Sequence, residues 1–459
     1  MQPDKQASIP ASATGGPSGP YPSQSPAIYD DLKELRKELD KCMHCGSCMA
    51  VCPVYNTRKL ESGVARGKIV VAEAVLDGTL ALDDQEVVEM LFNCLVCKSC
   101  MQGCPTKVNF DRIMLALRAA IVRKNGLPWL KKAIFSTLRN PALFDRGMKV
   151  GAMLSGLAFR DAGQKAISPR SPFAFVGKQA GFDEDRLLPA LAPEALRDHL
   201  PELVQVSNPQ AKVAFFTGCS LNYFYPQTGK DLVEVLHENQ VEVSVPKDQG
   251  CCGVPAFVHG DVDTIRELGK RNLDAMDRSG ADYLITGCGS CGGAWQNEYK
   301  EIFSGDPIYG PKAQHWSERT YDISSFLVDV IKYRPPLGKV DAVVTYHDSC
   351  HLKKTMKVSR EPREILKNIP GVTFKEMSKP DACCGSGGSF VLTHFGTSTE
   401  IAKRKVEDAN QTAADTVTTG CPACMMQLLD NLHRFGQGQQ VRHYVSLLAE
   451  SYRKENEAQ

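Results

Sequence analysis

Two runs of four cysteines stand near the front of the chain, spaced so that their thiolates could bind metal together. The members of the runs are Cys42, Cys45, Cys48 and Cys52, and then Cys94, Cys97, Cys100 and Cys104. Each run reads C-x2-C-x2-C-x3-C-P, the pattern that binds two [4Fe–4S] clusters, in which the fourth cysteine of a run reaches the cluster of the other run. We therefore expect two ligand sets: Cys42, Cys45, Cys48 and Cys104 for one cluster, and Cys94, Cys97, Cys100 and Cys52 for the other.

Zinc is the alternative for these runs, because C-x2-C pairs also form tetrahedral structural zinc sites. A zinc site needs only four ligands and gains nothing from the x2-x2-x3-Pro spacing. Since that spacing occurs twice, iron–sulfur clusters are the stronger prediction.

The remaining ten cysteines form two sets of five. The first set is Cys219, Cys251, Cys252, Cys288 and Cys291, and the second is Cys350, Cys383, Cys384, Cys421 and Cys424. Corresponding members lie 131 to 133 residues apart, and this nearly constant offset indicates an internal repeat. A glycine follows the adjacent pair in both sets, so we call the two units the first and second Cys-Cys-Gly repeats.

Strand-like segments end just before the cysteines of both repeats. They cover 212–217, 241–245 and 281–286, and then 342–346, 372–376 and 415–418. Helical patterns lie between them at 229–238, 262–278, 361–368 and 396–410. This alternation predicts parallel sheets covered by helices. Because such sheets bind ligands beyond the carboxyl ends of their strands, we expect five thiols to converge on one spot in each repeat.

Composition and charge exclude several classes of protein. The 54 Lys and Arg residues nearly balance the 53 Asp and Glu residues, which gives no electrostatic reason to expect nucleic acid or an anionic membrane as a partner. Eighteen cysteines without a visible signal peptide indicate metal binding in a reducing, cytoplasmic compartment. No apolar stretch reaches 18 residues, so we expect no transmembrane segment. No G-x-G-x-x-G is expected to open a nucleotide-binding βαβ unit, because the cysteines of the run 287–292 belong to the first set of five, and no P-loop motif occurs, so the sequence indicates no nucleotide or flavin site.

Helical patterns surround the two cysteine runs near the front. We expect helices within 60–76, from Asp83 to residue 91 with Asp83 and Glu86 as a capping box, and from Asp111 to Gly126. Amphipathic helices over 127–165 should break near Pro141. The apolar stretch 150–159 is too short to span a bilayer, and we expect it to be core or a subunit contact rather than a membrane contact.

The predicted fold class is α+β and multidomain: a mainly helical two-cluster ferredoxin-like module, then two α/β Cys-Cys-Gly domains with parallel strands. The predicted boundaries are 1–27 for a disordered tail, 28–126 for the ferredoxin-like domain, 127–210 for a helical segment and linker, 211–335 for the first Cys-Cys-Gly domain and 336–455 for the second.

Over residues 30–450 the chain resembles a known family. The pattern Cys-x(31–32)-Cys-Cys-Gly-x(34–35)-Cys-x2-Cys, present twice after a two-cluster module, is similar to that of the iron–sulfur subunit of glycolate oxidase and the matching subunits of lactate and anaerobic glycerol-3-phosphate dehydrogenases. It also resembles heterodisulfide reductase, whose Cys-Cys-Gly motifs hold noncubane [4Fe–4S] clusters. The resemblance implies two such clusters here, one on Cys219, Cys251, Cys252, Cys288 and Cys291, the other on Cys350, Cys383, Cys384, Cys421 and Cys424.

The resemblance implies an iron–sulfur electron-transfer subunit of a flavin-dependent 2-hydroxy-acid dehydrogenase that oxidises glycolate or D-lactate. Such an oxidation needs a hydride acceptor, whereas iron–sulfur clusters take up single electrons. We therefore expect a separate FAD-containing dehydrogenase subunit as partner, a quinone or another carrier as electron acceptor, and no catalytic residue in this chain. A cytoplasmic location is expected, with peripheral association at the inner face of the membrane left open.

Two other functions stay open at this stage. The Cys-Cys-Gly repeats could reduce a disulfide in their own right, or they could be structural zinc domains that dock a partner. His347 and His351 flank Cys350 and could donate to a cluster sulfur or protonate a thiol, although a packing role is the more common one. Lys98 and Lys107 could raise a cluster potential or could lie at the solvated surface.

Overall fold

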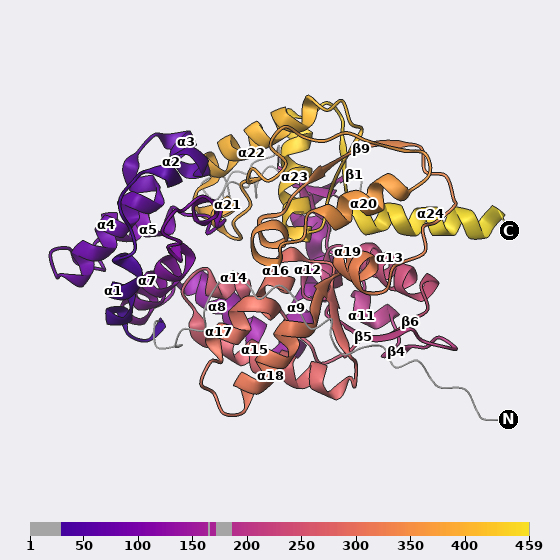
Figure 1. The fold of residues 1–459 in the computed structure, drawn as a ribbon, viewed down its shortest axis with the longest axis horizontal. Helices are drawn as coiled ribbons and strands as arrows, with labels where there is room; N and C mark the ends of the chain where they lie inside the picture. Colours follow the sequence, from indigo (N-terminus) through magenta and orange to yellow (C-terminus); the bar gives the residue numbers. More distant parts are fainter. Residues whose placement is uncertain (1–28, 164–165, 171–185, 459) are drawn as a thin grey trace, which may run out of the picture.

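The computed structural model describes residues 29–163, 166–170 and 186–458. The predicted tail, 1–27, lies outside this part of the chain. Figure 1 shows a helical N-terminal module beside a larger body that contains both Cys-Cys-Gly repeats. The module, in indigo, contacts both repeats, so segments far apart in sequence lie side by side.

The N-terminal module is helical, as predicted. Its helices are η2 (Leu32–Leu35), α1 (Arg36–Leu39), α2 (Ser47–Val51), α3 (Pro53–Arg58), η3 (Glu61–Gly63), α4 (Ala65–Leu76), α5 (Gln85–Phe92), α6 (Ser99–Gln102) and α7 (Phe110–Asn125). One face of α7 is fully buried, including Ile113, Met114 and Leu117, so this helix forms the core of the module.

Two of the predicted helix caps are wrong. The N-cap of α5 is Asp84, whose side chain accepts hydrogen bonds from Glu86 and Val87 backbone N–H groups, and Asp83 instead pairs with Lys124 at 2.8 Å. The N-cap of α7 is Asn109, while Asp111 sits in the first turn of this helix. Both corrections move the N-cap by one or two residues, because the residue at which a helix begins is set by local backbone geometry and not by spacing alone.

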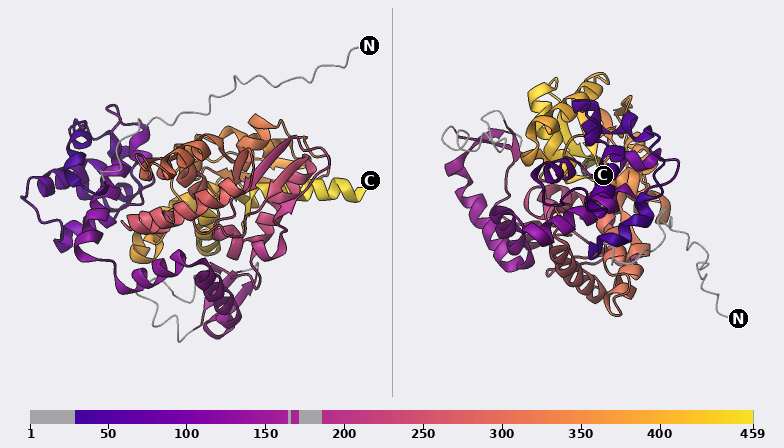
Figure 2. Two further views of the ribbon diagram at one scale, coloured as in Figure 1. Left: turned by 90° about the horizontal axis from the view of Figure 1, so that it is seen from below. Right: turned by 90° about the vertical axis from the view of Figure 1, so that its left-hand side faces the viewer.

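Two helices, α8 (Trp129–Arg139) and α9 (Pro141–Ala158), follow the module and break at Pro141 as predicted. Of the two roles expected for the stretch 150–159, core or subunit contact, the core is wrong. Every residue of α9 is exposed or half-buried, and Met153 and Leu157 are 80% and 71% exposed. Figure 2 shows this purple-to-magenta segment at the periphery of the molecule.

The segment predicted as a linker contains short elements. They are β1 (Phe159–Gly163), β2 (Ala166–Pro169) and β3 (Leu188–Pro189), which form a small antiparallel sheet, and then α11 (Leu196–His199) and β4 (Leu203–Val204). Residues 171–185 lie outside the described part of the chain.

The first Cys-Cys-Gly repeat is built on a five-stranded sheet with the order β4-β6-β5-β7-β8. Its strands are β5 (Ala211–Phe215), β6 (Val241–Ser244), β7 (Tyr283–Thr286) and β8 (Thr320–Asp322), which are all parallel, and the antiparallel edge strand β4. Its helices are α12 (Ser220–Tyr223), α13 (Pro226–Glu238), α14 (Val254–Phe257), α15 (Val262–Arg278), α16 (Gly289–Gly293), η5 (Ala294–Glu298), α17 (Tyr299–Ile302), α18 (Tyr309–Arg319), α19 (Ile323–Ser325) and η6 (Phe326–Val330).

The second repeat has a four-stranded parallel sheet with the order β10-β9-β11-β12. Its strands are β9 (Ala342–His347), β10 (Val372–Phe374), β11 (Thr416–Thr419) and β12 (Gln440–His443), and its helices are η7 (His351–Met356), α20 (Arg360–Asn368), α21 (Phe390–Thr393), α22 (Phe395–Asn410), α23 (Pro422–Phe435) and α24 (Tyr444–Ala458). The order of four strands is the same as in the first repeat. The prediction of two α/β units with parallel strands is therefore confirmed.

The two repeats meet at the carboxyl ends of their strands. The Gly289 N–H donates to the Gly420 carbonyl at 3.3 Å, and His443 Nε2 lies 3.0 Å from the Gly287 carbonyl. The last helix, α24, packs along α13 of the first repeat and buries Tyr444 and Tyr452 there. This contact brings the two sets of cysteines next to each other.

Candidate metal centres

Four cysteines from both runs line one hollow in the N-terminal module. They are Cys42, Cys45, Cys48 and Cys104, and the hollow has a volume of about 430 Å³. Cys42 and Cys45 lie in the loop before α2, Cys48 lies in α2, and Cys104 follows α6. Cys45 is exposed, and hydrogen bonds from Ser47 lower the pKa of its thiol. This hollow therefore lies close to the protein surface.

The other four cysteines of the runs line a second hollow, also of about 430 Å³. They are Cys52, Cys94, Cys97 and Cys100. Cys52 is the N-cap of α3, and Pro53 at the first helical position turns the chain so that this thiol leaves the first hollow. Cys100 borders both hollows, so the two are adjacent.

The second hollow touches the second Cys-Cys-Gly repeat. A hydrogen bond from the Cys383 thiol lowers the pKa of Cys97 to about 5. The Lys354 ammonium, only 3% exposed, donates to Ser99 Oγ at 2.6 Å and to the Asp381 carbonyl at 3.3 Å. Although burial opposes its charge, the thiols of Cys97 and Cys350 keep the pKa of Lys354 above its usual value. A positive charge thus lies between the two thiol groups.

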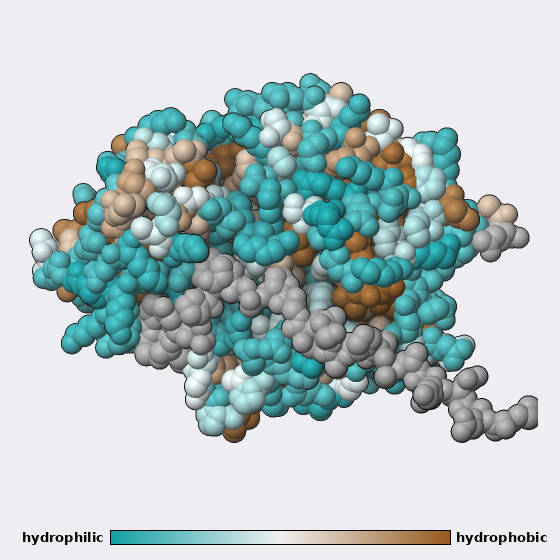
Figure 3. All heavy atoms as spheres, viewed as in Figure 1, coloured by the Kyte–Doolittle hydropathy of each residue, from teal (hydrophilic) through white to brown (hydrophobic). Residues whose placement is uncertain are grey.

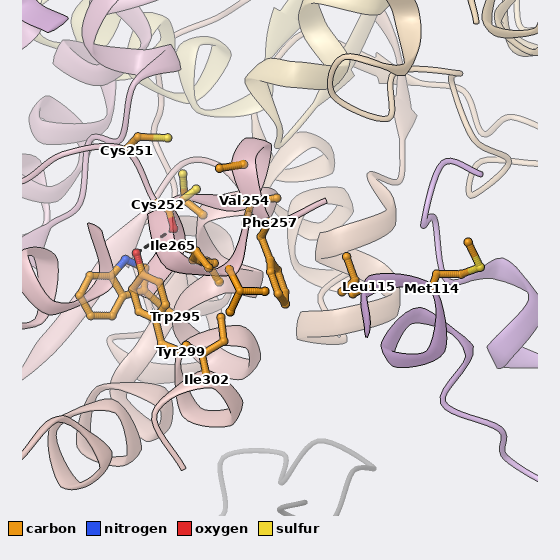
Figure 4. Packing of buried hydrophobic residues seen from close by; sticks show 14 of the residues in the cluster. Met114, Leu115, Cys251, Cys252, Val254, Phe257, Ile265, Trp295, Tyr299 and Ile302 are labelled. Atoms are coloured by element: carbon orange, nitrogen blue, oxygen red, sulfur yellow. Dashed lines mark hydrogen bonds between the residues drawn. The ribbon is translucent and has the colours of Figure 1, made fainter. Parts of the chain in front are cut away.

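The cysteines of the first repeat converge as predicted, at the ends of β5, β6 and β7. Hydrogen bonds from Cys251 and Cys291 lower the pKa of Cys252 to about 6, and Cys219 contacts Cys251. Tyr299 donates to the Cys252 carbonyl at 2.8 Å. Figure 4 shows Tyr299 and Trp295 beside Cys252, so aromatic rings close this side of the group.

The cysteines of the second repeat converge in the same way. Cys384 contacts Cys424, and Cys424 contacts Cys421. Cys421 also accepts a hydrogen bond from Cys288 of the first repeat, which helps to hold the pKa of Cys421 well below its usual range. The fifth member, Cys350, is fixed at the start of η7 and lies near Cys384 and Cys97. The two repeats therefore share a thiol-to-thiol contact that spacing did not predict.

The glycine of each Cys-Cys-Gly motif is required by the backbone. Gly253 and Gly385 have φ angles of +84° and +86°. A Cβ would lie 2.8 Å from Ile265 Cγ1 in the first repeat and 2.5 Å from the Ser398 carbonyl in the second. Only glycine combines this left-handed conformation with such close packing.

The structure tests the surface alternative that the sequence left open for the two lysines. Lys98 is buried, with its ammonium 3.1 Å from Asp111 and 3.4 Å from Glu298, so it is not a solvated surface residue. Lys107 is exposed. The sequence did not single out Lys354, because only the tertiary structure brings it between the N-terminal module and the second repeat.

A wide groove lies between the N-terminal module and the second repeat. It has a volume of about 1410 Å³ and runs from α3 to α22, with Cys383 and Lys354 in its wall. Figure 3 shows a hollow between these two parts on an otherwise mainly hydrophilic face. Of the second-repeat thiols, Cys383 is therefore open to this groove.

The residues present fit iron–sulfur clusters. All eighteen cysteines are free thiols. They lie in four groups of four or five, and the two hollows in the module are lined mostly by apolar atoms. Thiolate ligands in apolar, partly enclosed surroundings are the typical donors of such clusters.

Comparison with known proteins gives the class. Residues 38–108 match the 4Fe–4S dicluster domain family, and residues 213–295 and 344–429 each match the cysteine-rich CCG domain family. The chain is therefore an iron–sulfur protein with a dicluster module and two cysteine-rich domains.

The relatives give the family. The chain is 32% identical to the probable glycolate oxidase iron–sulfur subunit of Bacillus subtilis, over 92% of this chain and 97% of the relative. It is 31% identical to a subunit of the CoM/CoB fumarate reductase of Methanothermobacter marburgensis, over 93% and 74% of the two chains, and 31% identical to lactate utilization protein A 2 of Bacillus cereus, over 53% and 100%. The chain belongs to the family of glycolate oxidase iron–sulfur subunits.

This membership confirms the main functional prediction. The chain is an iron–sulfur electron-transfer subunit of an oxidoreductase, and a subunit implies at least one partner. The alternative of an independent disulfide reductase is not favoured. Among the described residues, none of the helices is long and apolar enough to cross a membrane.

Proposed function

We propose that this chain carries electrons from an FAD-containing dehydrogenase subunit that oxidises a 2-hydroxy acid, glycolate or D-lactate. The printed functions of the Bacillus relatives, glycolate oxidase and lactate utilization, support this substrate class. The chain has eighteen cysteines and no P-loop, and its G-x-G-x-x-G at residues 287–292 contains Cys288 and Cys291 of the first repeat, which fits a division of labour in which the partner performs the hydride step.

The proposed ligand sets follow the four groups of thiols. Cys42, Cys45, Cys48 and Cys104 would hold one [4Fe–4S] cluster, and Cys52, Cys94, Cys97 and Cys100 the second. The five cysteines of each Cys-Cys-Gly repeat would hold one noncubane cluster. When bound, such clusters accept and release single electrons.

The order of the thiol groups supports a relay through the molecule. Cys45 is exposed at one end, Cys100 borders both hollows, Cys97 contacts Cys383, and Cys421 contacts Cys288. The single observation that carries the proposal is this succession of neighbouring thiol groups. The chain itself shields the interior groups from water and holds them in fixed positions, which limits the reorganisation that accompanies each transfer.

Two measurements on anaerobically purified protein test the proposal. We expect about sixteen irons per chain with four [4Fe–4S] clusters, little zinc, and no oxidation of glycolate or D-lactate without the flavoprotein. Addition of the flavoprotein and substrate should reduce the clusters, and Cys97→Ser should stop reduction of the Cys-Cys-Gly centres while the exposed cluster still reduces. Turnover by the isolated, flavin-free chain would contradict the proposal, as would zinc near two per chain.

We also propose that the chain associates peripherally with an anionic membrane through α9, so that a quinone can serve as electron acceptor. The outer face of α9 exposes Leu143, Val150, Met153, Leu154 and Leu157 at helical spacing, and Trp129 of α8 is 81% exposed. Residues 129–160 contain six basic side chains and one acidic side chain, although the whole chain is nearly neutral. An apolar stripe flanked by basic residues is the pattern of interfacial helices.

Vesicles test this docking. We expect the chain to sediment with vesicles that contain anionic lipid and to lose most of this binding in the double variant Met153→Asp, Leu157→Asp. Leu337→Asp is the matched control, because Leu337 is 74% exposed and lies outside this face. Equal binding by both variants, or no binding by the wild-type chain, would overturn the membrane proposal and leave a protein partner as the occupant of the face.

A further inference from the structure

The second Cys-Cys-Gly repeat contains a candidate metal ligand that is not a cysteine. A ring nitrogen of His347 and the sulfurs of Cys384 and Cys424 all lie within 4.8 Å of one another, and all three residues are buried. This is the spacing of side chains that share one metal ion. The three residues come from the end of β9, the Cys-Cys-Gly loop and the first turn of α23, so the fold brings them together from distant parts of the repeat.

The first repeat has no such histidine. His347 stands three residues before Cys350, and the residue three before Cys219 is Phe216. Phe216 is fully buried, and its ring contacts the Trp295 ring at 5.4 Å. The sulfur pair equivalent to Cys384 and Cys424 is present in the first repeat as Cys252 and Cys291. The two repeats therefore match in their thiols and differ at this position.

His347 also has an unsatisfied ring nitrogen. The side chain is 1% exposed, and its Nδ1 has no hydrogen-bond partner among the described residues, although the ring contacts the Cys384 thiol. Burial of an unpaired polar nitrogen is costly, so such groups in native proteins usually bind something. The backbone of His347 is fixed, because it ends the central strand β9 and its carbonyl accepts a hydrogen bond from Thr419 Oγ1 at 3.0 Å. The imidazole is therefore held beside the thiols while its Nδ1 lacks a protein partner in the described part of the chain.

A neighbouring histidine behaves differently. His351 Nδ1 lies 3.4 Å from Ser290 Oγ and 3.9 Å from Cys350 Sγ, so its ring already has partners. His351 is thus the natural control for His347, since it lies in the same repeat and is adjacent to Cys350 in sequence.

We propose that His347 is a nitrogen ligand of the iron centre in the second repeat, which makes this centre a mixed thiolate and imidazole site, whereas the first repeat is ligated by thiolates alone. The proposal rests on the proposed function only in requiring iron at the second repeat. A neutral imidazole nitrogen beside the five thiolates would change the charge distribution around the iron, so the two repeats should differ in reduction potential.

The test is pulsed EPR of the intact chain in its complex with the flavoprotein. If the wild-type protein is produced in cells grown with ¹⁵N-histidine, the nitrogen coupling of one cluster signal should change from the ¹⁴N to the ¹⁵N pattern. This comparison requires no variant. The coupling should disappear in His347→Phe, the residue that the first repeat uses, and remain in His351→Phe and His44→Phe. His347→Phe should also shift the midpoint potential of the second-repeat centre and leave those of the other centres unchanged.

The outcomes separate the possible failures. Four intact clusters without histidine nitrogen coupling in the wild-type chain would overturn the His347 assignment and leave the electron-transfer proposal intact. Coupling that survives His347→Phe would overturn the assignment as well. Zinc in place of iron at the second repeat, seen in metal analysis of the same sample, would overturn both proposals.

Discussion

The two Cys-Cys-Gly repeats have the same strand order and the same five cysteines, yet their surroundings differ. In the first repeat Trp295 and Tyr299 pack against the thiols, and four of the five cysteines are buried. In the second repeat Cys350 and Cys383 are only half-buried, and Cys383 lies between the N-terminal module and an open groove. The thiols of the first repeat are thus enclosed by protein, whereas Cys383 of the second repeat adjoins the N-terminal module and the groove.

This difference shows how a duplicated motif takes on two roles. The cysteines and the motif glycine keep the ability to hold a metal centre in both copies, because backbone geometry depends on them. The neighbours that set the charge, hydrogen bonding and burial around a centre differ: Lys354 and His347 in the second repeat, Tyr223 and Phe216 at the same offsets in the first. Since those neighbours tune reduction potential, equal cysteine sets do not imply equal centres.

The largest expected effect concerns the glycine of the Cys-Cys-Gly motif, which both repeats share. Gly385→Ala and Gly253→Ala should each lower the free energy of unfolding by about 4 kcal/mol, because each combines a left-handed backbone with a clashing Cβ. Denaturant unfolding under anaerobic conditions measures this. Gly438→Ala is the control, since its φ is +89° but a Cβ there would meet no described heavy atom within 4 Å, and it should cost only about 1 kcal/mol. Equal losses at all three positions would show that packing at the motif is unimportant.

The next prediction concerns the seam between the repeats. Asp322 of the first repeat accepts hydrogen bonds from Tyr444 of the second at 2.7 Å and from the Ser324 N–H at 2.9 Å, and burial raises its pKa to about 6. The unfolded chain has a pKa near 3.9 at this residue. The folded chain therefore holds the proton more tightly, and this contribution to stability is complete below about pH 4 and lost as the pH rises to about 6.

Asp322→Asn should remove that loss and be more stable than the wild-type chain at pH 7 by roughly 3 kcal/mol. Unfolding free energies at several pH values between 4 and 7 test this against Asp329→Asn, an exposed carboxyl near the same edge. If the Asp322→Asn and wild-type curves run parallel over this range, the seam does not contain a tightly held proton.

A smaller effect is expected where Lys354 lies between the N-terminal module and the second repeat. Lys354→Met removes a buried ammonium between the thiols of Cys97 and Cys383, and we expect a loss of about 2 kcal/mol in stability together with lower midpoint potentials for the centres on both sides. Potentiometric titration followed by EPR measures the potentials. Lys353→Met, a partly exposed neighbour, should leave them unchanged. Unaltered potentials in Lys354→Met would mean that this charge does not distinguish the two repeats.

The smallest effect is expected in the first repeat, beside its enclosed thiols. Tyr299→Phe removes the hydroxyl that donates to the Cys252 carbonyl at 2.8 Å and accepts from Asn272 at 3.0 Å, which should cost about 1 kcal/mol. The EPR signal of the first repeat should change slightly and the others should not. Tyr333→Phe is the control, with a similar hydroxyl that is far from the thiols. A change confined to the second repeat would reverse the proposed contrast.

The sequence by itself determined the four groups of cysteines, the duplication, the mainly helical module and the parallel α/β units. The six predicted strand segments and four helical segments of the repeats correspond to observed elements, because their apolar patterns are local and end at glycine-rich turns. The cap of α5 and the burial of α9 were wrong, since caps depend on local geometry and burial depends on what packs against a helix.

Only the tertiary structure decided how the groups connect. The contacts of Cys97 with Cys383 and of Cys288 with Cys421 join residues more than 130 positions apart, and spacing within a motif has no information about them. The same holds for Lys354, which reaches Ser99 across 255 residues, and for the unpaired nitrogen of His347. Ligand spacing is a local property of the chain, whereas charge, burial and contact between centres arise when separate domains pack together.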